Sequence, residues 1–313
     1  MKINEACILE DRGIIYIDGP DTKEFLQNIV TNNLDFVSEN RSIYSSILTP
    51  QGKYLFDFIL VKHKKGYLID CEKNELENLI KTLNLYKLRS KIEILNLSNE
   101  FTVAAISYEK FNEIFTSTLK KIWEKTKYVP NENDRIGWTV KYREDSIVLD
   151  PRNRELGTRL ISNLEKLHLS LKKLDLKIVD KKIYYEKSYE LGIPQINNSK
   201  LKDKIFGIEC NFEKLNAIDF KKGCFVGQEN TSRIRLRNKL RRRLMPLKVK
   251  EGNIDEGDVI KFNSSEVGKV LIDKPFPFGI IKLNNPNINE FLDKDLTSKK
   301  AKINIVNLEW LNL

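Results

Sequence analysis

The sequence predicts a mixed α+β protein with two α+β lobes and a small β-barrel, and three observations lead to this fold class. The chain has 313 residues, 41% of them hydrophobic and 31% charged, which is enough for about two domains with sizeable cores. Strand-like and helical patterns alternate through residues 1–243. Residues 244–313 carry short apolar runs separated by Gly, Asn and Pro, as in a small barrel. We therefore place the lobes at 1–98, 99–243 and 244–313.

The first lobe begins with an alternating strand that ends at Gly19-Pro20. Asp21 and Glu24 then resemble a capping box at the start of a helix. The predicted order is a strand at 13–19, a helix at 22–30, a hairpin of 42–48 and 54–61, a strand at 67–70, and a helix marked by Leu76, Leu79, Ile80 and Leu83.

The second lobe repeats the mixture of strands and helices. Its predicted elements are strands at 101–107 and 145–149, a helix between them with Phe111, Ile114, Phe115 and Leu119, a helix at 180–191 that stops at Gly192-Ile193-Pro194, and a helix from Gln228 to Leu244.

The positive charge of the chain is concentrated in one segment. Lys and Arg number 54 against 44 Asp and Glu, a net charge of +10. Residues 221–243 hold nine basic residues and one acidic residue, a net of +8, which leaves 45 basic and 43 acidic residues elsewhere. The segment predicts a local anion-binding surface. The alternative is a solvated cationic helix.

Several classes of protein are disfavoured by what the sequence lacks. Four cysteines without a C-x-x-C pair are typical of a reducing compartment, and two histidines are too few for a histidine-rich zinc site. We expect no stable metal centre. The absence of P-loop and G-x-G-x-x-G motifs disfavours nucleotide hydrolysis and nicotinamide chemistry. With no signal-peptide pattern and no apolar run of membrane-spanning length, we expect a cytoplasmic protein without membrane contact.

The most informative stretch is KKGCFVGQE at 221–229. Its two glycines, Gly223 and Gly227, permit a sharply turned loop and close approach of another molecule. Cys224 precedes the predicted helix, so the helix dipole and the neighbouring lysines favour its thiolate. The other cysteines lie in apolar or mixed contexts, which predicts simple packing.

This stretch, followed by Arg233, resembles the K-G-C-[FY]-x-G-Q-E signature of the YgfZ-type folate-binding proteins. These proteins are relatives of the aminomethyltransferase of the glycine cleavage system and include a mitochondrial iron–sulfur maturation factor. Most of the chain shows the same resemblance, in order, in IDGPDTKEFLQNIVTNN (17–33), LTPQGKYLFDFIL (48–60), LYKLRSKIEI (85–94), DPRNRELGTRL (150–160), YELGIPQ (189–195), GIECNFEKLNAIDFKKGC (207–224) and EVGKVLIDKPFPFGIIKLN (266–284).

The resemblance implies three lobes in a ring around a channel that holds tetrahydrofolate, and a role in maturation or repair of 4Fe–4S proteins. Its implied partners are iron–sulfur assembly proteins or client 4Fe–4S enzymes. Cys224 would be an exposed nucleophile or transient iron ligand, and Lys222 the cation that favours its thiolate. The motif match also selects Gly223, Gly227, Gln228, Glu229 and Arg233, with Gln228 and Glu229 capping the helix or orienting the loop. By the Y-E-L-G-I-P match, Tyr189 and Glu190 would contact folate.

Two further functions stay open at this stage. The aminomethyltransferases carry a catalytic acid in an Asn-Ala-rich segment, where this chain reads LIDCE at 68–72, so one-carbon transfer rests on Asp70, which more plausibly ends a strand. Such a transferase could act in tRNA modification. A nucleic-acid module would use Arg233, Arg235, Arg237 and Arg241–Arg243, with Arg233/Arg237 and Arg237/Arg241 on one helical face. The basic segment lacks the aromatic residues that stack on bases, so this reading is not favoured.

Overall fold

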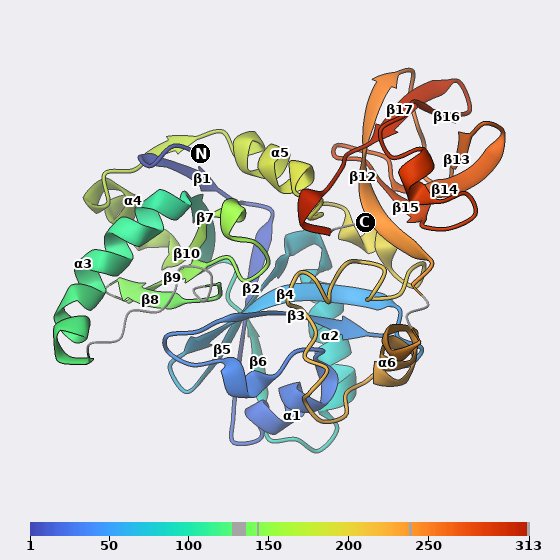
Figure 1. Ribbon diagram of the computed structural model, residues 1–313. Helices are drawn as coiled ribbons and strands as arrows, with labels where there is room; N and C mark the ends of the chain where they lie inside the picture. The colour runs from blue at the N-terminus through green and yellow to red at the C-terminus, as the bar shows by residue number, and fades with distance from the viewer. Residues whose placement is uncertain (127–135, 143, 238–239, 312–313) are drawn as a thin grey trace. The chain divides into compact units, whose positions relative to one another are not determined.

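The structure is a computed structural model that describes residues 1–126, 136–142, 144–237 and 240–311 (Figure 1). The chain forms two compact units, each assembled from three separate segments. The first unit contains Met1–Ser46, Asp57–Tyr184 and Leu215–Gly223, and the second contains Ile47–Phe56, Tyr185–Lys214 and Cys224–Leu313. No helix among the described residues is both long enough and apolar enough to cross a membrane.

The N-terminal sheet has five strands in the order β3-β4-β5-β2-β6. These strands and the two helices of this part of the chain are β2 (Arg12–Asp18), α1 (Thr22–Ile29), β3 (Ile43–Leu48), β4 (Tyr54–His63), β5 (Gly66–Glu72), α2 (Leu76–Lys87) and β6 (Glu93–Asn96). Leu76, Leu79 and Leu83 form the buried face of α2, as the sequence pattern predicts. A short helix, η1 (Leu34–Phe36), follows α1.

The predicted capping box at the start of α1 is wrong. The Asp21 side chain makes no hydrogen bond to the first turn of the helix. Its carboxylate accepts instead from the backbone N–H of Lys91, 70 positions along the chain, at 2.7 Å. The local pattern predicted the helix correctly, but the Asp21 carboxylate binds the distant Lys91 backbone instead of capping the helix.

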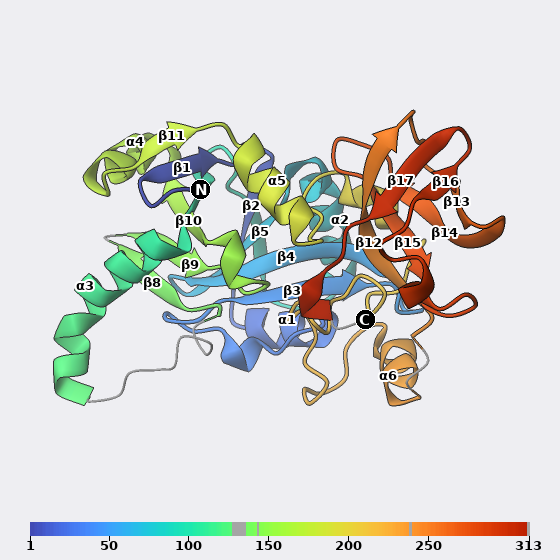
Figure 2. The ribbon, with the colours of Figure 1, turned by 45° about the horizontal axis from the view of Figure 1, so that its top comes forward.

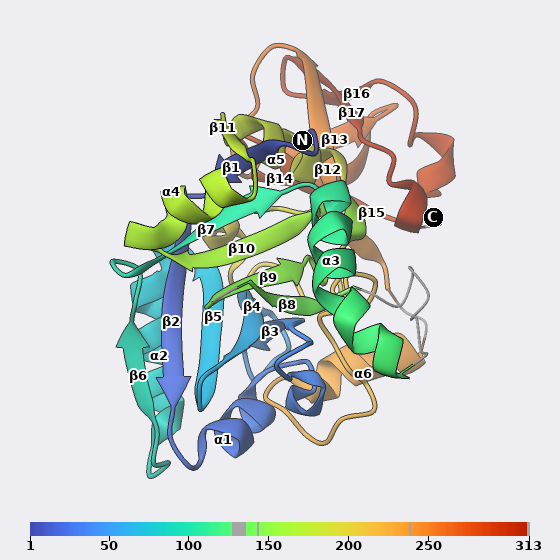
Figure 3. The same cartoon turned by 90° about the vertical axis from the view of Figure 1, so that its left-hand side faces the viewer.

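A second sheet has six strands in the order β11-β1-β7-β10-β9-β8 (Figure 3). The elements are β1 (Glu5–Ile8), β7 (Phe101–Ile106), α3 (Tyr108–Thr126), β8 (Thr139–Tyr142), β9 (Asp145–Leu149), β10 (Thr158–Asn163), α4 (Leu164–Lys173), β11 (Lys177–Val179) and α5 (Lys182–Glu190). Phe111 and Phe115 of α3 and Leu167 and Leu171 of α4 are buried in the core on this sheet. The side chain of Leu119, predicted to share this helical face, lies outside the described residues.

The C-terminal part of the chain forms a closed six-stranded barrel in the order β12-β15-β14-β13-β16-β17 (Figure 2). Its strands are β12 (Arg242–Glu251), β13 (Val259–Phe262), β14 (Ser265–Ile272), β15 (Phe278–Lys282), β16 (Leu296–Ser298) and β17 (Ala301–Ile305). Met245, Ile260, Phe291 and Ile303 are fully buried in its core. The predicted fold class, mixed α+β with a small C-terminal barrel, is confirmed. The exact lobe boundaries, 1–98, 99–243 and 244–313, stay a prediction.

The predicted helix from Gln228 to Leu244 is too long. Helix α6 covers Gln228–Leu236 only, and strand β12 has already begun at Arg242. Leu244 and Met245 are fully buried there. Residues of β12 pair with two barrel strands, β15 and β17. Arg241 lies outside α6, so its predicted i,i+4 pairing with Arg237 on one helical face is wrong.

Candidate functional site

Cys224 is exposed, whereas Cys7, Cys71 and Cys210 are buried. The Cys7 and Cys71 thiols each donate to a backbone carbonyl, at 3.4 Å and 3.7 Å. Burial raises the pKa of both, that of Cys71 to about 12. Raised pKa and burial make a thiol unreactive. Cys224 is therefore the thiol that another molecule can reach.

The loop that carries Cys224 ends at a glycine in the left-handed region. Gly227 has a φ of +83° and directly precedes α6. A Cβ at this position would lie 2.5 Å from the carbonyl oxygen of Thr49, so a larger residue does not fit. Gly223 differs, since a Cβ there would meet nothing within 4 Å. Packing requires the glycine at 227 and not the glycine at 223.

Polar side chains of α6 hold the loop in place. Gln228 Oε1 accepts from the backbone N–H of Phe225 at 3.3 Å, which folds the side chain back over the loop. Asn230 donates from Nδ2 to the carbonyl oxygen of Gln51 at 2.8 Å. The Phe225 ring is buried. Of the two roles predicted for Gln228, these contacts correspond to orienting the loop.

Four of the predicted site residues line one open hollow of about 630 Å³ in the second unit. The lining residues are Cys224, Phe225, Gln228, Glu229, Ser232, Arg233, Leu236 and Arg237. Glu229 and Arg233 form an i,i+4 ion pair at 2.8 Å, and both side chains are exposed, so the pair contributes little to stability. Leu236 is 84% exposed. The hollow thus brings together a thiol, two guanidinium groups and apolar surface.

Lys222, two residues before Cys224 in the sequence, points into the first unit. Its Nζ donates to the backbone carbonyls of Gln27, Val30 and Asn32 at 2.7, 2.5 and 3.0 Å, at the C-terminal end of α1. These three acceptors match the three N–H bonds of an ammonium group, and a cation is favoured at a helix C-terminus. Burial lowers the pKa of Lys222 to about 8. The side chain caps α1; that its charge favours the Cys224 thiolate stays a prediction.

The arginines of the basic segment are distributed over different elements. Arg235 of α6 forms an ion pair with Glu213 at 2.7 Å. Arg242 of β12 donates to both carboxylate oxygens of Glu209, at 2.9 and 3.2 Å. These ion pairs hold the Arg235 and Arg242 side chains against glutamates of the second unit. The described residues therefore present no single helical face of arginines across 233–243.

Tyr189 and Glu190 lie at the C-terminal end of α5 in the second unit. The Tyr189 hydroxyl donates to the carbonyl oxygen of Leu247, and its ring packs on Phe276 and Phe278 with centroids 5.6 and 5.7 Å apart. Burial raises the pKa of Tyr189. Glu190 is exposed, and its carboxylate makes no hydrogen bond with any described residue. Tyr189 is thus engaged in packing, while Glu190 is accessible.

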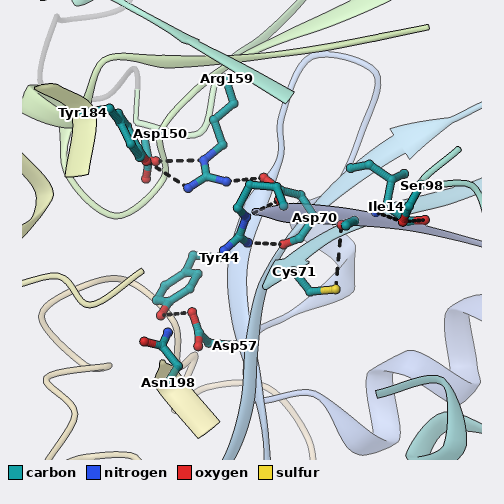
Figure 4. A network of polar contacts seen from close by, with 12 residues as sticks. Ile14, Tyr44, Asp57, Asp70, Cys71, Ser98, Asp150, Arg159, Tyr184 and Asn198 are labelled. Carbon is teal, nitrogen blue, oxygen red and sulfur yellow. Dashed lines mark hydrogen bonds and ion pairs between the residues drawn. The ribbon is translucent and has the colours of Figure 1, made fainter. Parts of the chain in front are cut away.

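The first unit contains a buried ionic network that the sequence did not predict (Figure 4). Asp70 of β5 accepts from Arg12 Nε at 2.7 Å and pairs with Arg159 of β10. Asp150 accepts from Arg152 through both carboxylate oxygens, at 2.9 and 2.6 Å. Arg159 also lies 3.4 Å from Asp150. The D-P-R and L-G-T-R segments held three of these residues, but nothing in sequence spacing indicates that Arg159 pairs with Asp70, 89 positions away.

The network decides what Asp70 can do. The residue lies inside β5 rather than at its end. Burial alone raises the pKa of Asp70, but the charges of Arg12 and Arg159 outweigh it and hold the pKa below its usual value. A carboxylate that stays ionised and paired does not donate a proton, so Asp70 is unsuited to replace a catalytic acid.

No protein-family model matches the chain. Among curated proteins it is 29% identical over 287 residues to "Iron-sulfur cluster assembly factor IBA57 homolog, mitochondrial" of Dictyostelium discoideum, a match that covers 83% of this chain and 66% of that protein. It is 29% identical over 238 residues to "tRNA-modifying protein YgfZ" of Buchnera aphidicola, covering 74% of this chain and 70% of that protein.

The chain spans about half to two thirds of the length of several curated relatives, with 52% coverage for the Neurospora crassa IBA57 homologue. Among solved structures, aminomethyltransferase T of the glycine cleavage system from Bartonella henselae superposes with a TM-score of 0.71 at 14% identity, covering 98% of this chain and 86% of that one. At that identity the match establishes the fold alone. The chain is therefore similar in sequence to the IBA57 and YgfZ proteins and has the fold of the aminomethyltransferase.

Proposed function

We propose that this protein is an accessory factor for the assembly or repair of iron–sulfur proteins, 4Fe–4S enzymes in particular, and that Cys224 is its working thiol. The observation that carries the proposal is the contrast among the four cysteines, of which only Cys224 is exposed. Its relatives named as iron–sulfur assembly factors support this function.

The cysteine inventory also limits how such a factor could work. Iron–sulfur clusters are held by about four ligands, mostly thiolates. Among the described residues, no three His, Cys, Asp or Glu side chains come together as a metal site. One exposed thiol can therefore contribute a single ligand to a cluster that is its cargo. The remaining ligands would come from an assembly protein or a client enzyme, which we propose as the partners.

Tetrahydrofolate is the cofactor that we propose, and Glu190 is the residue that fits it best. The carboxylate of Glu190 is exposed and can accept hydrogen bonds from the N–H groups of a pterin. The Tyr189 hydroxyl is already engaged with Leu247 and does not fit that role. When bound, tetrahydrofolate supplies a carrier for one-carbon units.

The structure gives less support to the two alternative functions, one-carbon transfer and nucleic-acid binding. One-carbon transfer depends on a proton-donating acid, and the buried ion pairs of Asp70 argue against that residue. Nucleic-acid binding depends on a continuous basic face, whereas Arg235 and Arg242 pair with glutamates on separate elements. A cytoplasmic location stays a prediction, since the IBA57 relatives are named as mitochondrial.

Gene replacement in the source organism tests the proposed function. The gene is deleted, the activity of a 4Fe–4S radical enzyme is measured in extracts, and the strain is complemented with wild type, Cys224→Ala or Cys7→Ala. Cys7 is a matched control because it is buried. We expect deletion to lower the activity, wild type and Cys7→Ala to restore it, and Cys224→Ala to fail at equal protein level.

The other outcomes separate the parts of the proposal. If Cys224→Ala restores activity, the assembly role stands and the thiol has no part in it. If deletion leaves every 4Fe–4S enzyme unaffected, the assembly role is wrong. Folate binding is measured separately, by calorimetry with tetrahydrofolate on wild type and Glu190→Gln, with weaker binding expected for the variant.

A further inference from the structure

A second cavity, of about 550 Å³, lies within the first unit, and no residue assigned to the proposed function lines it. It forms where the β4–β5 turn, the start of β7, the β8–β9 hairpin and the start of α4 meet. Figure 3 shows β8, β9 and α4 in this unit. Cavities of this volume are typical of small-molecule sites.

His63 at the end of β4 lines this cavity, and its imidazole makes no hydrogen bond with any described residue. Its ring lies edge-on between Tyr16 and Phe101, with centroids 5.9 and 5.7 Å away and interplanar angles of 87° and 80°. Burial, with Lys141 and Lys64 nearby, lowers the pKa of His63, and Glu39 opposes this only in part. The neutral imidazole therefore has one N–H to offer.

Lys141 of β8 offers a second donor on the same side. Its Nζ donates to the carbonyl oxygen of Lys62 at 3.1 Å and to Ser146 Oγ at 2.8 Å. The nearest carboxylate oxygen, on Glu39, is 3.9 Å away, beyond hydrogen-bond distance. An ammonium group has three N–H bonds, and the third makes no hydrogen bond with a described residue, although the Glu39 carboxylate pairs with the charge at 3.9 Å.

The N-terminus of α4 adds the partial positive charge of a helix dipole to the cavity. Asn163 caps this ten-residue helix by accepting from the N–H of Glu165 at 3.0 Å, and both Asn163 and Lys166 line the cavity. A helix N-terminus favours an anion. Four acidic residues line the cavity, namely Glu39, Glu100, Glu144 and Asp145, beside Lys64, Lys141 and Lys166. Glu144 pairs with Lys166 at 2.7 Å and Asp145 accepts from Ser170 at 2.7 Å.

We propose that this cavity binds a small organic anion, a carboxylate or a phosphate ester on an apolar body. The anionic group lies between Lys141 Nζ and the His63 imidazole and accepts a hydrogen bond from each. The apolar body lies against the Phe101 ring. This site is separate from the Cys224 hollow, which belongs to the second unit, and it does not depend on the proposed function.

The two histidines of the chain make the test direct, because each gives one resolved imidazole Cε1–H signal in an NMR spectrum. His168 is exposed on α4 and serves as the internal reference. The full-length protein is titrated with phenylacetate, phenyl phosphate and the neutral benzyl alcohol. We expect an anionic probe to shift the His63 signal and raise the His63 pKa by about one unit, with His168 unmoved. Benzyl alcohol should not raise that pKa.

Two variants show whether the donor is Lys141. Lys141→Met should lose the response of His63 to the anionic probes, at least tenfold in apparent affinity, while Lys172→Gln on the exposed face of α4 should retain it. Unchanged amide spectra confirm that both variants fold. A response to only one probe identifies the ligand as a carboxylate or a phosphate. No shift of His63 with either anion, equal shifts of both histidines, or an undiminished response in Lys141→Met overturns the proposal.

Discussion

Cys224 differs from the other cysteines in its surroundings, and the difference lies in the residues that flank it. Cys7 and Cys71 lie in strands β1 and β5 and Cys210 in a turn, and all three are buried. Cys224 lies between glycine and the buried anchor Phe225, so the backbone is held while the thiol stays exposed. The sequence predicted this contrast, because lysines and a glycine precede Cys224 whereas the other three cysteines stand in apolar or mixed contexts.

Thiol counting checks this contrast directly. In native protein, we expect one thiol per chain to react within minutes with a disulfide reagent, and four to react after denaturation in guanidinium. Cys224→Ala should leave no fast-reacting thiol. Fast reaction of two or more thiols in native wild type would contradict the burial of the others.

Lys222 gives a prediction about pH, because its pKa is about 8 when folded and about 10.4 when unfolded. Between these values the unfolded chain binds more protons than the folded one, so unfolding free energy rises with pH. Relative to Lys222→Met, wild type should gain about 3 kcal/mol from pH 7.5 to 10.5. Urea unfolding of both proteins across this range measures the gain. Parallel pH profiles would show that the ammonium is not buried as described.

At the scale of elements, the turn at 49–52 and the start of α6 hold each other in the second unit. The two glycines that meet there, Gly52 and Gly227, both have a φ of +83°. The two motif glycines, Gly223 and Gly227, therefore have unequal roles, which sequence alone did not distinguish. Only Gly227 lies against a backbone oxygen, that of Thr49, and this contact between distant segments is visible only in the fold.

Alanine substitutions at the two motif glycines test this inequality. Gly227→Ala should lower the unfolding free energy by about 1–3 kcal/mol, because φ is positive and the Cβ would overlap Thr49. Gly223→Ala, the matched control, should change it by about 0.5 kcal/mol or less. Chemical unfolding measures both. Equal losses at the two positions would show that the loop has another conformation.

Helices and strands were predictable where the apolar period was long and uninterrupted. Helices α1 and α2 and the β3–β4 hairpin follow their patterns closely. The end of α6 was predicted too late, because no glycine or proline interrupts the sequence between Gln228 and Pro246, and the pairing of β12 with β15 and β17 cannot be read from one sequence. Edge strands such as β6 and β11 are short and exposed, so their sequences carry little signal.

At the scale of the whole molecule, the buried ionic network joins the two open sheets of the first unit. Arg12 and Asp70 belong to the five-stranded sheet, and Arg159 belongs to the six-stranded one. Such a contact cannot be predicted from one sequence, because Arg12, Asp70 and Arg159 lie on strands far apart in the chain and no regular spacing relates them. The cost of burying these charges is recovered only if all of them are present.

Asp70→Asn should therefore lower the unfolding free energy by about 3–5 kcal/mol at pH 7, since Arg12 loses its buried carboxylate partner and Arg159 keeps only the longer contact with Asp150. Asp35→Asn, which breaks the exposed pair with Lys23, should cost about 0.5 kcal/mol. Denaturant unfolding measures both losses.

The difference in unfolding free energy between wild type and Asp70→Asn should also depend on pH in the acid range. The pKa of Asp70 is below its usual value in the folded protein, so its contribution is present above about pH 4 and is lost as pH falls through the folded pKa. The gap between wild type and Asp70→Asn should thus narrow below pH 4. A gap that stays constant from pH 7 to pH 3 would mean that Asp70 is not ionised in the fold.

The capping of α1 by Lys222 also has a consequence for synthesis on the ribosome. The ammonium group reaches carbonyls that precede it by 190 to 195 positions, within a unit assembled from three separate segments of the chain. Since a nascent chain emerges from its N-terminus, α1 leaves the exit tunnel long before its cap is translated. The three carbonyl oxygens at the end of α1 therefore receive the Lys222 ammonium only after residue 222 has emerged.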